Sequence, residues 1–306
     1  MTPGHRTYSA FWQRLTIAVV GGDEREQEIC RLAAASGAVV KAFGFPWPSG
    51  GIPGVVLAAD AARALAGAHI ALMPIPGIAV DGSLFATTQI VPREPLLGEM
   101  APGAHIILGR ADEGLRRAAA ALGIGVREYE GDHELMLLRS PAIVEGLIKV
   151  LIENTQITIH GARIGLIGQG NIGTVLTRTL IALGAHVTVG ARNPIQRASA
   201  YTLGAVPLAL ERLAEAAGSF DVLVSTAPAP IVTPALIDRL QPGALIVDMT
   251  APPGSCDLKY ATTTGRKAIW ARALGRRAPI TVGASQWLGI ARIIDEIFNE
   301  GARRES

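Results

Sequence analysis

The chain has 306 residues, enough for two average domains, and 49% of them are hydrophobic. This composition excludes a chain that is disordered over most of its length. The 28 basic and 26 acidic side chains give a formal net charge of +2, so we expect neither nucleic acid nor a membrane surface to be its main partner.

Cys30 and Cys256 are the two cysteines of the chain. Two thiols are too few for a disulfide framework or a four-thiolate metal site, and the six histidines lack zinc-binding spacing. We therefore expect reduced thiols and no bound metal. The sequence also lacks a secretory signal and an apolar run long enough to span a membrane, so a cytoplasmic location is expected.

Short apolar strands alternate with helices in the first half, the pattern of an α/β protein with a parallel sheet. The expected strands cover 15–20, 39–43, 69–73 and 105–108, and the expected helices cover 24–35 and 113–122. Loops rich in proline and glycine follow at 45–54 and 74–82. We predict that residues 1–140 form an N-terminal Rossmann-like or flavodoxin-like domain.

A second series of strands and helices begins after an apolar helix predicted over 142–154. Its expected strands are 163–167, 186–189, 222–225 and 244–248, and its expected helices are 175–183, 208–217, 234–240 and 283–299. The predicted fold class is α/β, with two Rossmann-like domains and parallel sheets joined by an inter-domain helix. We place that helix at 141–156, the second domain at 157–282 and a C-terminal helix packing at the junction at 283–306.

A glycine-rich turn follows the strand predicted at 163–167: Gly168-Gln169-Gly170-Asn171-Ile172-Gly173. Between a strand and a helix, this spacing is the fingerprint of dinucleotide binding. The first glycine permits the tight turn, the second lets a pyrophosphate approach the backbone, and the third lets helix and strand pack closely. The second domain is therefore predicted to bind a nicotinamide dinucleotide through this turn.

The next strand ends in Gly190, Ala191, Arg192 and Asn193. A site that prefers NAD usually places an acidic residue here for the ribose 2′-hydroxyl, but this segment has none. Arg192 can instead bind a 2′-phosphate in a bidentate manner. The sequence therefore predicts NADP rather than NAD.

Two more loops follow strands of the same predicted sheet, where ligands of open α/β sheets bind. One holds Thr226, Ala227 and Pro228, and the other holds Thr250. We expect both to contact the cofactor. Ser140 and Glu145 flank the start of the inter-domain helix, from where side chains can reach the expected cleft, and they are the candidate catalytic residues. The chain has neither a nucleophile elbow nor a P-loop.

Several motifs occur together in one order along the chain, from about Leu15 to Phe298. They are Gly21-Gly22-Asp23 with Arg25 and Glu28, Thr158-Ile159-His160-Gly161, the glycine turn, Gly190-Ala191-Arg192, Asp248, Pro253-Gly254, Asp257, Lys259-Tyr260-Ala261, Ala278-Pro279, Thr281 and Gly283. With these motifs the sequence resembles the family of the dipicolinate synthase A subunit.

The resemblance implies an NADP-linked oxidoreductase of endospore-forming bacteria, in the cytoplasm of the mother cell. Proteins of this family act with a flavoprotein B subunit to convert dihydrodipicolinate, a small cyclic dicarboxylate, to dipicolinate. A homo-oligomer is also expected. The chain departs from the family pattern near the expected substrate, at Ile143, at Ala251 and Pro252, and at Arg276 and Arg277.

The proposed reaction needs groups that hold two carboxylates and one group that accepts a proton. The candidates for holding carboxylates are Arg25, Arg139, Arg276 and Arg277, with Ser140 as a further donor, and Glu145 is the candidate proton acceptor. Two alternatives stay open: an NADP-dependent reductase or dehydrogenase of a small 2-oxo or imino acid, and a non-catalytic NADP-binding regulatory subunit.

Overall fold

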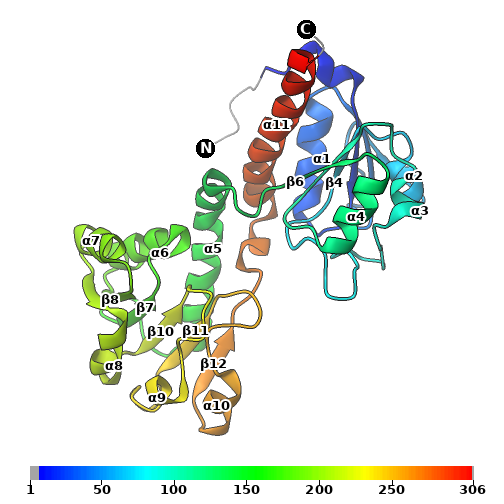
Figure 1. Ribbon diagram of the computed structural model, residues 1–306. Coiled ribbons are helices and arrows are strands. Elements are labelled where there is room, and N and C mark those ends of the chain that lie inside the picture. Colours follow the sequence, from blue (N-terminus) through cyan, green and yellow to red (C-terminus); the bar gives the residue numbers. More distant parts are fainter. Residues whose placement is uncertain (1–6, 305–306) are drawn as a thin grey trace. The chain divides into compact units, whose positions relative to one another are not determined.

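The computed structural model describes residues 7–304, with side chains as far as residue 299. The chain divides into two compact units. Unit 1 comprises Met1–Arg139 and Ala278–Ser306, and unit 2 comprises Ser140–Arg277. Each unit contains a six-stranded parallel sheet, which confirms the predicted fold class (Figure 1). No helix in the described part of the chain is long and apolar enough to cross a membrane.

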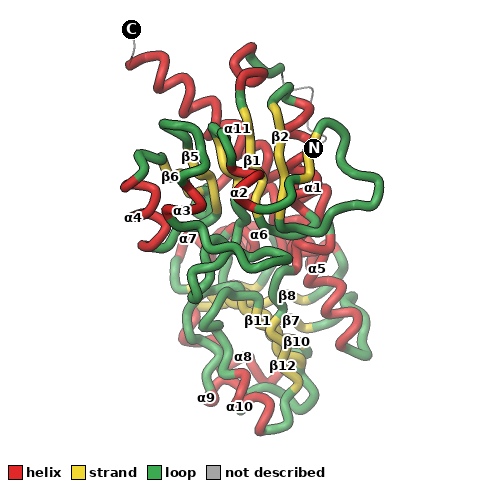
Figure 2. The backbone as a smooth tube through the Cα atoms, turned by 90° about the vertical axis from the view of Figure 1, so that its right-hand side faces the viewer, coloured by secondary structure: helices red, strands yellow, loops and turns green. Residues whose placement is uncertain are grey.

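The sheet of unit 1 has the strand order β3-β2-β1-β4-β5-β6, in which every neighbouring pair is parallel. This order is that of a doubly wound Rossmann-like sheet. The strands, yellow in Figure 2, are β1 Thr16–Val20, β2 Val39–Phe43, β3 Val55–Leu57, β4 Ile70–Leu72, β5 His105–Leu108 and β6 Gly125–Glu128.

Two layers of helices cover this sheet, as two separate apolar clusters on either side of β1 show: Ile17 and Val19 belong to one, Ala18 and Val20 to the other. Both faces of β1 are thus buried, as expected for a central parallel strand. The helices of unit 1 are α1 Arg25–Ala35, α2 Ala61–Leu65, α3 Glu94–Leu97, α4 Glu113–Ala121 and α11 Pro279–Arg304, with a 3-10 turn at Ala10–Arg14.

The C-terminal helix α11 packs lengthwise on α1 (Figure 1). A Cβ atom on Gly283 would lie 2.6 Å from the backbone oxygen of Arg25, so this residue must be small for the two helices to approach. Further along α11, Asp295 accepts a hydrogen bond of 2.9 Å from the indole of Trp12. The segment predicted to pack at the domain junction is therefore an integral layer of unit 1.

The sheet of unit 2 has the order β12-β11-β10-β7-β8-β9 and is also parallel throughout. Its strands are β7 Arg163–Ile167, β8 His186–Ala191, β9 Val206–Ala209, β10 Val222–Ser225, β11 Leu245–Asp248 and β12 Lys267–Trp270. Its helices include α6 Asn171–Ala182, α7 Pro194–Thr202, α8 Leu213–Ala216, α9 Pro234–Ile237 and α10 Leu258–Thr263.

Helix α5, His133–Asn154, is longer than predicted and contains the point at which unit 1 gives way to unit 2. The helix predicted over 208–217 was wrong at its first two residues, which belong to a strand. Residues 206–209 form the edge strand β9, which pairs with β8. An edge strand tolerates Pro207, and this pairing outweighs the weak local preference of the leucine- and alanine-rich segment for a helix.

Candidate functional site

The glycine turn of unit 2 lies between β7 and α6, as its spacing predicts. Gly168 has a φ of +96°, and a Cβ atom there would lie 2.7 Å from the hydroxyl oxygen of Thr226. A Cβ atom on Gly173 would lie 2.3 Å from the carbonyl oxygen of Gly168. Both positions therefore require glycine: the first for its backbone conformation, the third for the close contact between helix and strand.

Gly170 differs from these two glycines because a Cβ atom there would meet nothing within 4 Å. The space above it opens at the start of α6, where Asn171, Ile172 and Gly173 form the first helical residues. The amides of a first helical turn bind phosphate, and the helix dipole favours negative charge there. The turn therefore fits the pyrophosphate of a dinucleotide.

The end of β8 carries the predicted 2′-phosphate residue. Arg192 is exposed, and its guanidinium has no partner among residues 7–304. Asn193 accepts a hydrogen bond of 2.8 Å from the amide of Ile195 and thereby caps α7. Arg197, which sequence reasoning missed, donates to the carbonyl oxygens of Ala191 and Arg192 at 2.9 and 2.6 Å. This turn thus has two guanidinium groups, and no acidic residue occurs between 190 and 205.

The loop after β11 is held by one buried carboxylate. Asp248 accepts hydrogen bonds from the amide and hydroxyl of Thr250, at 2.9 and 2.7 Å, and from the amides of Ser255 and Cys256, at 2.7 and 2.9 Å. Burial and the charge of Asp248 raise the pKa of the Cys256 thiol to about 12. The predicted cofactor residue Thr250 thus uses its side chain to fix the loop, and Cys256 stays a neutral thiol. The sequence signal for Asp248 was an acid at a strand end followed by small residues.

The other predicted cofactor loop follows β10. The hydroxyl of Thr226 donates to the carbonyl oxygen of Ile167 at 3.1 Å, which ties this loop to the strand before the glycine turn. Ala227 is half-buried and Pro228 is exposed. Gly190, at the end of β8, packs against Leu213. A Cβ atom on Gly190 would lie 3.1 Å from Cδ1 of Leu213. The Thr226 loop thus lies directly beside Gly168, and its contact with the cofactor stays a prediction.

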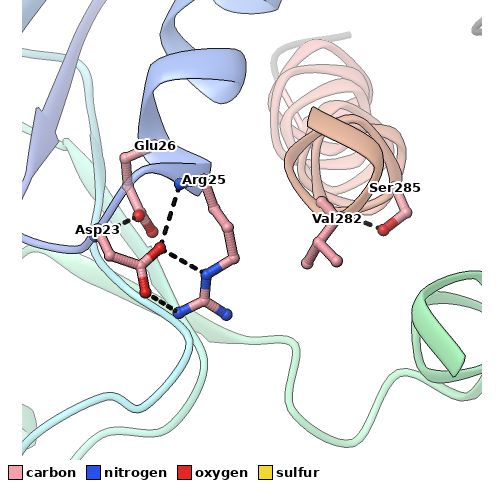
Figure 3. Close-up of polar contacts among 5 residues, drawn as sticks. All are labelled: Asp23, Arg25, Glu26, Val282 and Ser285. Atoms are coloured by element: carbon pink, nitrogen blue, oxygen red, sulfur yellow. Dashed lines mark hydrogen bonds and ion pairs between the residues drawn. The ribbon is translucent and has the colours of Figure 1, made fainter. Parts of the chain in front are cut away.

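In unit 1, the turn between β1 and α1 holds a buried ion pair. Arg25 donates from Nε and Nη2 to the two carboxylate oxygens of Asp23, at 2.7 and 2.8 Å. The third guanidinium nitrogen, Nη1, points away from Asp23 and has no partner among the residues that the structure describes (Figure 3). The Arg25 side chain is only 12% exposed. Its guanidinium is therefore fixed in orientation and keeps one edge for an anion.

Arg139 lies in the same electrostatic neighbourhood as Arg25 and Tyr129. Its Nε atom is buried and has no hydrogen-bond partner within the described chain. Burial lowers the pKa of Arg139, and the charge of Arg25 lowers it further. Burial is also the main reason why the pKa of the Tyr129 hydroxyl is raised. The structure thus brings together two of the four arginines that were proposed from the sequence to hold carboxylates.

The remaining predicted residues lie in unit 2. Arg277 forms an ion pair with Glu145, whose side chain is 62% exposed. Both residues line a shallow, mainly apolar groove beside the C-terminal half of α6, whereas the glycine turn lies at the N-terminus of that helix. Ser140 is buried, and Arg276 is exposed in the 3-10 turn Leu274–Arg277. Their assignment to catalysis and to carboxylate binding stays a prediction.

Three other positions that depart from the family pattern lie on α5 and in the loop after β11. Ile143 is half-buried on α5, while Ala251 and Pro252 are exposed in the loop that Asp248 holds. The part of the chain that the structure describes contains no group of three or more histidine, cysteine or acidic residues that could hold a metal ion. The residues that carry the candidate chemistry are the dinucleotide turn of unit 2 and the arginines of unit 1.

Two Rossmann-like sheets, one of them with a dinucleotide turn, define the class: the chain is an NAD(P)-dependent oxidoreductase. The family model described as NADP oxidoreductase, coenzyme F420-dependent, matches residues 163–252, and the model for the N-terminal domain of the dipicolinate synthase A subunit matches residues 16–129. The A subunit of dipicolinate synthase from Bacillus subtilis (strain 168) is 31% identical over 291 residues, which cover 94% of this chain and 98% of that protein. The chain belongs to the family of the dipicolinate synthase A subunit.

Solved structures agree with this assignment. The crystal structure of the dipicolinate synthase A subunit from Bacillus halodurans superimposes with a TM-score of 0.83 at 26% identity, covering 91% of this chain and 97% of that one. The corresponding chain from Bacillus subtilis gives a TM-score of 0.83 at 28% identity, covering 94% and 97%. The similarity to these two structures thus extends over both units.

Proposed function

We propose that the chain is the A subunit of a dipicolinate synthase and oxidises dihydrodipicolinate to dipicolinate with NADP. The observation that carries this proposal is the Arg25 guanidinium, held by Asp23 through two hydrogen bonds with Nη1 left for an anion. A planar cation with a fixed orientation suits a carboxylate, and Arg139 supplies a second buried cation nearby. Together they fit a small dicarboxylate, the class of compound to which dipicolinate belongs.

The dinucleotide turn supplies the other reactant. When bound, NADP provides a nicotinamide ring that accepts a hydride. Gly168, Gly170 and Gly173 would hold its pyrophosphate at the start of α6, and Arg192 would bind the 2′-phosphate. Arg197 keeps the turn that carries Arg192 in place through the two carbonyl oxygens. These residues support NADP over NAD.

The proposed reaction balances without a further oxidant. A ring carbon of dihydrodipicolinate gives a hydride to NADP, a ring proton leaves, and the product is an aromatic pyridine that keeps both carboxylates. The residues of the chain have to hold the two carboxylates, orient the ring and exclude water. Because the relatives are A subunits of a synthase, we further propose that the chain works with a second subunit, which is a flavoprotein.

The proposal is tested by supplying the purified chain with freshly generated dihydrodipicolinate and NADP, with and without the flavoprotein. The assay follows NADPH and dipicolinate together, and both should appear in equal amounts. Arg25→Lys should raise the apparent KM for the dicarboxylate at least about tenfold and leave the KM for NADP unchanged, because lysine cannot replace the guanidinium fork. Arg31→Lys, on the exposed side of the same helix, is the matched control.

The cofactor preference is tested separately. Replacing Arg192 by alanine should weaken NADP(H) binding by about 1.5–3 kcal/mol, roughly 10- to 150-fold, and leave NAD(H) binding nearly unchanged. Arg239→Ala, a change of an exposed arginine elsewhere in unit 2, is the control. Equal losses for both cofactors would show that Arg192 does not contact the 2′-phosphate. Binding of NADPH without any turnover would indicate a regulatory subunit, and turnover of an unrelated keto acid would indicate a different reductase.

A further inference from the structure

Glu26 is a buried acid in the first turn of α1, next to Arg25. Its Oε2 atom accepts the amide of Asp23 at 2.7 Å, while Asp23 accepts the amide of Arg25 at 3.1 Å. This reciprocal pattern resembles a capping box. Gly22 lies directly under the Glu26 side chain, since a Cβ atom on it would be 2.2 Å from the Glu26 carboxyl carbon. Glu26 is thus locked against the turn that carries Asp23, and Asp23 in turn orients Arg25 (Figure 3).

The groups around Glu26 come from several elements. Asp23 faces it from the turn, Arg25 and Cys30 from α1, and Tyr129 from the segment after β6. Helix α11 approaches this part of α1 at Gly283, which lies against the backbone of Arg25 and the side chain of Glu28 and carries no charge. Burial, opposed by Arg25 and the Asp23 amide, raises the pKa of Glu26 to about 7. Burial also raises the pKa values of Cys30 and Tyr129, so among these groups it is Glu26 that changes charge near neutral pH.

The state of Glu26 decides the net charge of the cluster. Arg25 and Arg139 carry two positive charges, and Asp23 carries one negative charge. With Glu26 ionised these four groups sum to zero, and with Glu26 protonated they sum to +1. A dianion near Arg25 raises the energy of an ionised Glu26, so binding of the dianion and protonation of Glu26 favour each other.

We propose that Glu26 is a positioning residue that takes up a proton when a dicarboxylate binds at Arg25. This inference rests on the proposed function. A protonated Glu26 carboxyl group still has one oxygen that can accept the Asp23 amide, so the orientation of Arg25 is kept while one negative charge disappears. Substrate affinity should therefore fall as the pH rises above neutrality.

The test uses the full-length chain and dipicolinate itself, titrated by calorimetry in two buffers of different ionisation enthalpy. The difference in heat gives the number of protons taken up per bound dicarboxylate. We expect about 0.5 at pH 7, where half of the free Glu26 is already protonated, and about 0.9 at pH 8. The dissociation constant should rise up to about tenfold between pH 6 and pH 8.

Two variants complete the experiment. Glu26→Gln keeps an acceptor for the Asp23 amide but cannot titrate, so proton uptake should vanish and the pH dependence of affinity should fall below about twofold. Glu28→Gln, which removes a buried carboxylate paired with Arg31 on the same helix, should leave the uptake unchanged. A purely structural role of Glu26 would alter affinity without altering the number of protons.

The outcomes separate the two proposals. Dipicolinate binding without proton uptake in the unmodified chain, or with the same uptake in Glu26→Gln, overturns the role of Glu26 and leaves the proposed function standing. No binding of dipicolinate and no turnover of dihydrodipicolinate overturn the proposed function, and the inference with it. Because proton uptake by the unmodified chain is measured first, the inference can fail even if a variant folds poorly.

Discussion

Replacing Glu26 by glutamine should change how the stability of unit 1 depends on pH, even without any ligand. The pKa of Glu26 is about 7 in the folded chain against an ordinary value of 4.5, because the carboxyl is buried. Between these two values the folded state binds more protons than the unfolded state. Stability is therefore fully present below pH 4.5 and is lost as the pH rises towards 7.

The size of this loss follows from the pKa difference. A pKa of about 7 in place of 4.5 corresponds to about 3 kcal/mol of unfolding free energy, most of which is lost between pH 5 and pH 8. Glu26→Gln removes the titrating group and so removes this part of the pH dependence. The side-chain NH2 group of the new glutamine does not titrate, so the cost of burying it is the same at pH 5 and pH 8. This cost therefore cancels in the difference between the two unfolding free energies.

The assay is urea unfolding at pH 5 and pH 8, followed by tryptophan fluorescence. Trp12, Trp47 and Trp287 lie in unit 1, whereas Trp270 is the one tryptophan of unit 2, so a Trp270→Phe background reports on unit 1 alone. The unmodified chain should lose about 2–3 kcal/mol more unfolding free energy than Glu26→Gln between the two pH values. Glu28→Gln should behave like the unmodified chain. Equal losses in all three chains would show that Glu26 does not titrate in this range.

Three further predictions concern unit 2 and the thiols. Gly173→Ala should lower the melting temperature and abolish NADP(H) binding, because the new Cβ atom would lie 2.3 Å from the carbonyl oxygen of Gly168. Gly170→Ala has open space around the new methyl group, so it should keep the melting temperature and lose only NADP(H) binding. If Gly170→Ala bound NADP(H) normally, the pyrophosphate would not lie there. Asp248→Ala leaves four buried donors without their acceptor and should cost about 3 kcal/mol or more in thermal unfolding, whereas the exposed Asp238→Ala should cost under about 1 kcal/mol. Finally, both cysteines should react slowly with a thiol reagent at pH 8, because burial raises the pKa of each; one fast equivalent in the folded chain would contradict this.

Local sequence signals predicted the parts of the fold that depend on local chemistry. The turn between β7 and α6 was predictable because each glycine has its own steric reason within six residues. The four short edge strands β3, β6, β9 and β12 were not found, because they are defined by pairing with a neighbour rather than by their own composition. Periodicity over three or four residues is too short a signal to reveal them.

The candidate site likewise has residues that local sequence could identify and residues whose role depends on distant segments. Arg25 and Arg192 could be named because a cation beside a glycine-rich turn has a recognisable chemistry. The buried role of Asp248 and the raised pKa of Glu26 depend on which segments cover them, and a single sequence does not contain that information. The ion pair between Glu145 and Arg277 joins residues 132 positions apart, so no local pattern could indicate it.

The packing of α11 on α1 makes unit 1 discontinuous in the sequence. On the ribosome, Trp12 emerges long before Asp295, its hydrogen-bond partner 283 positions later. Unit 2 lies wholly between the two segments, so it can complete its sheet while α1 still lacks the helix that covers it. During that interval the apolar face of α1 is open to water and to other chains. We therefore expect translation of α11 to be the step that covers this face of unit 1, and a chain that stops before α11 to hold one finished unit and one unfinished, aggregation-prone one.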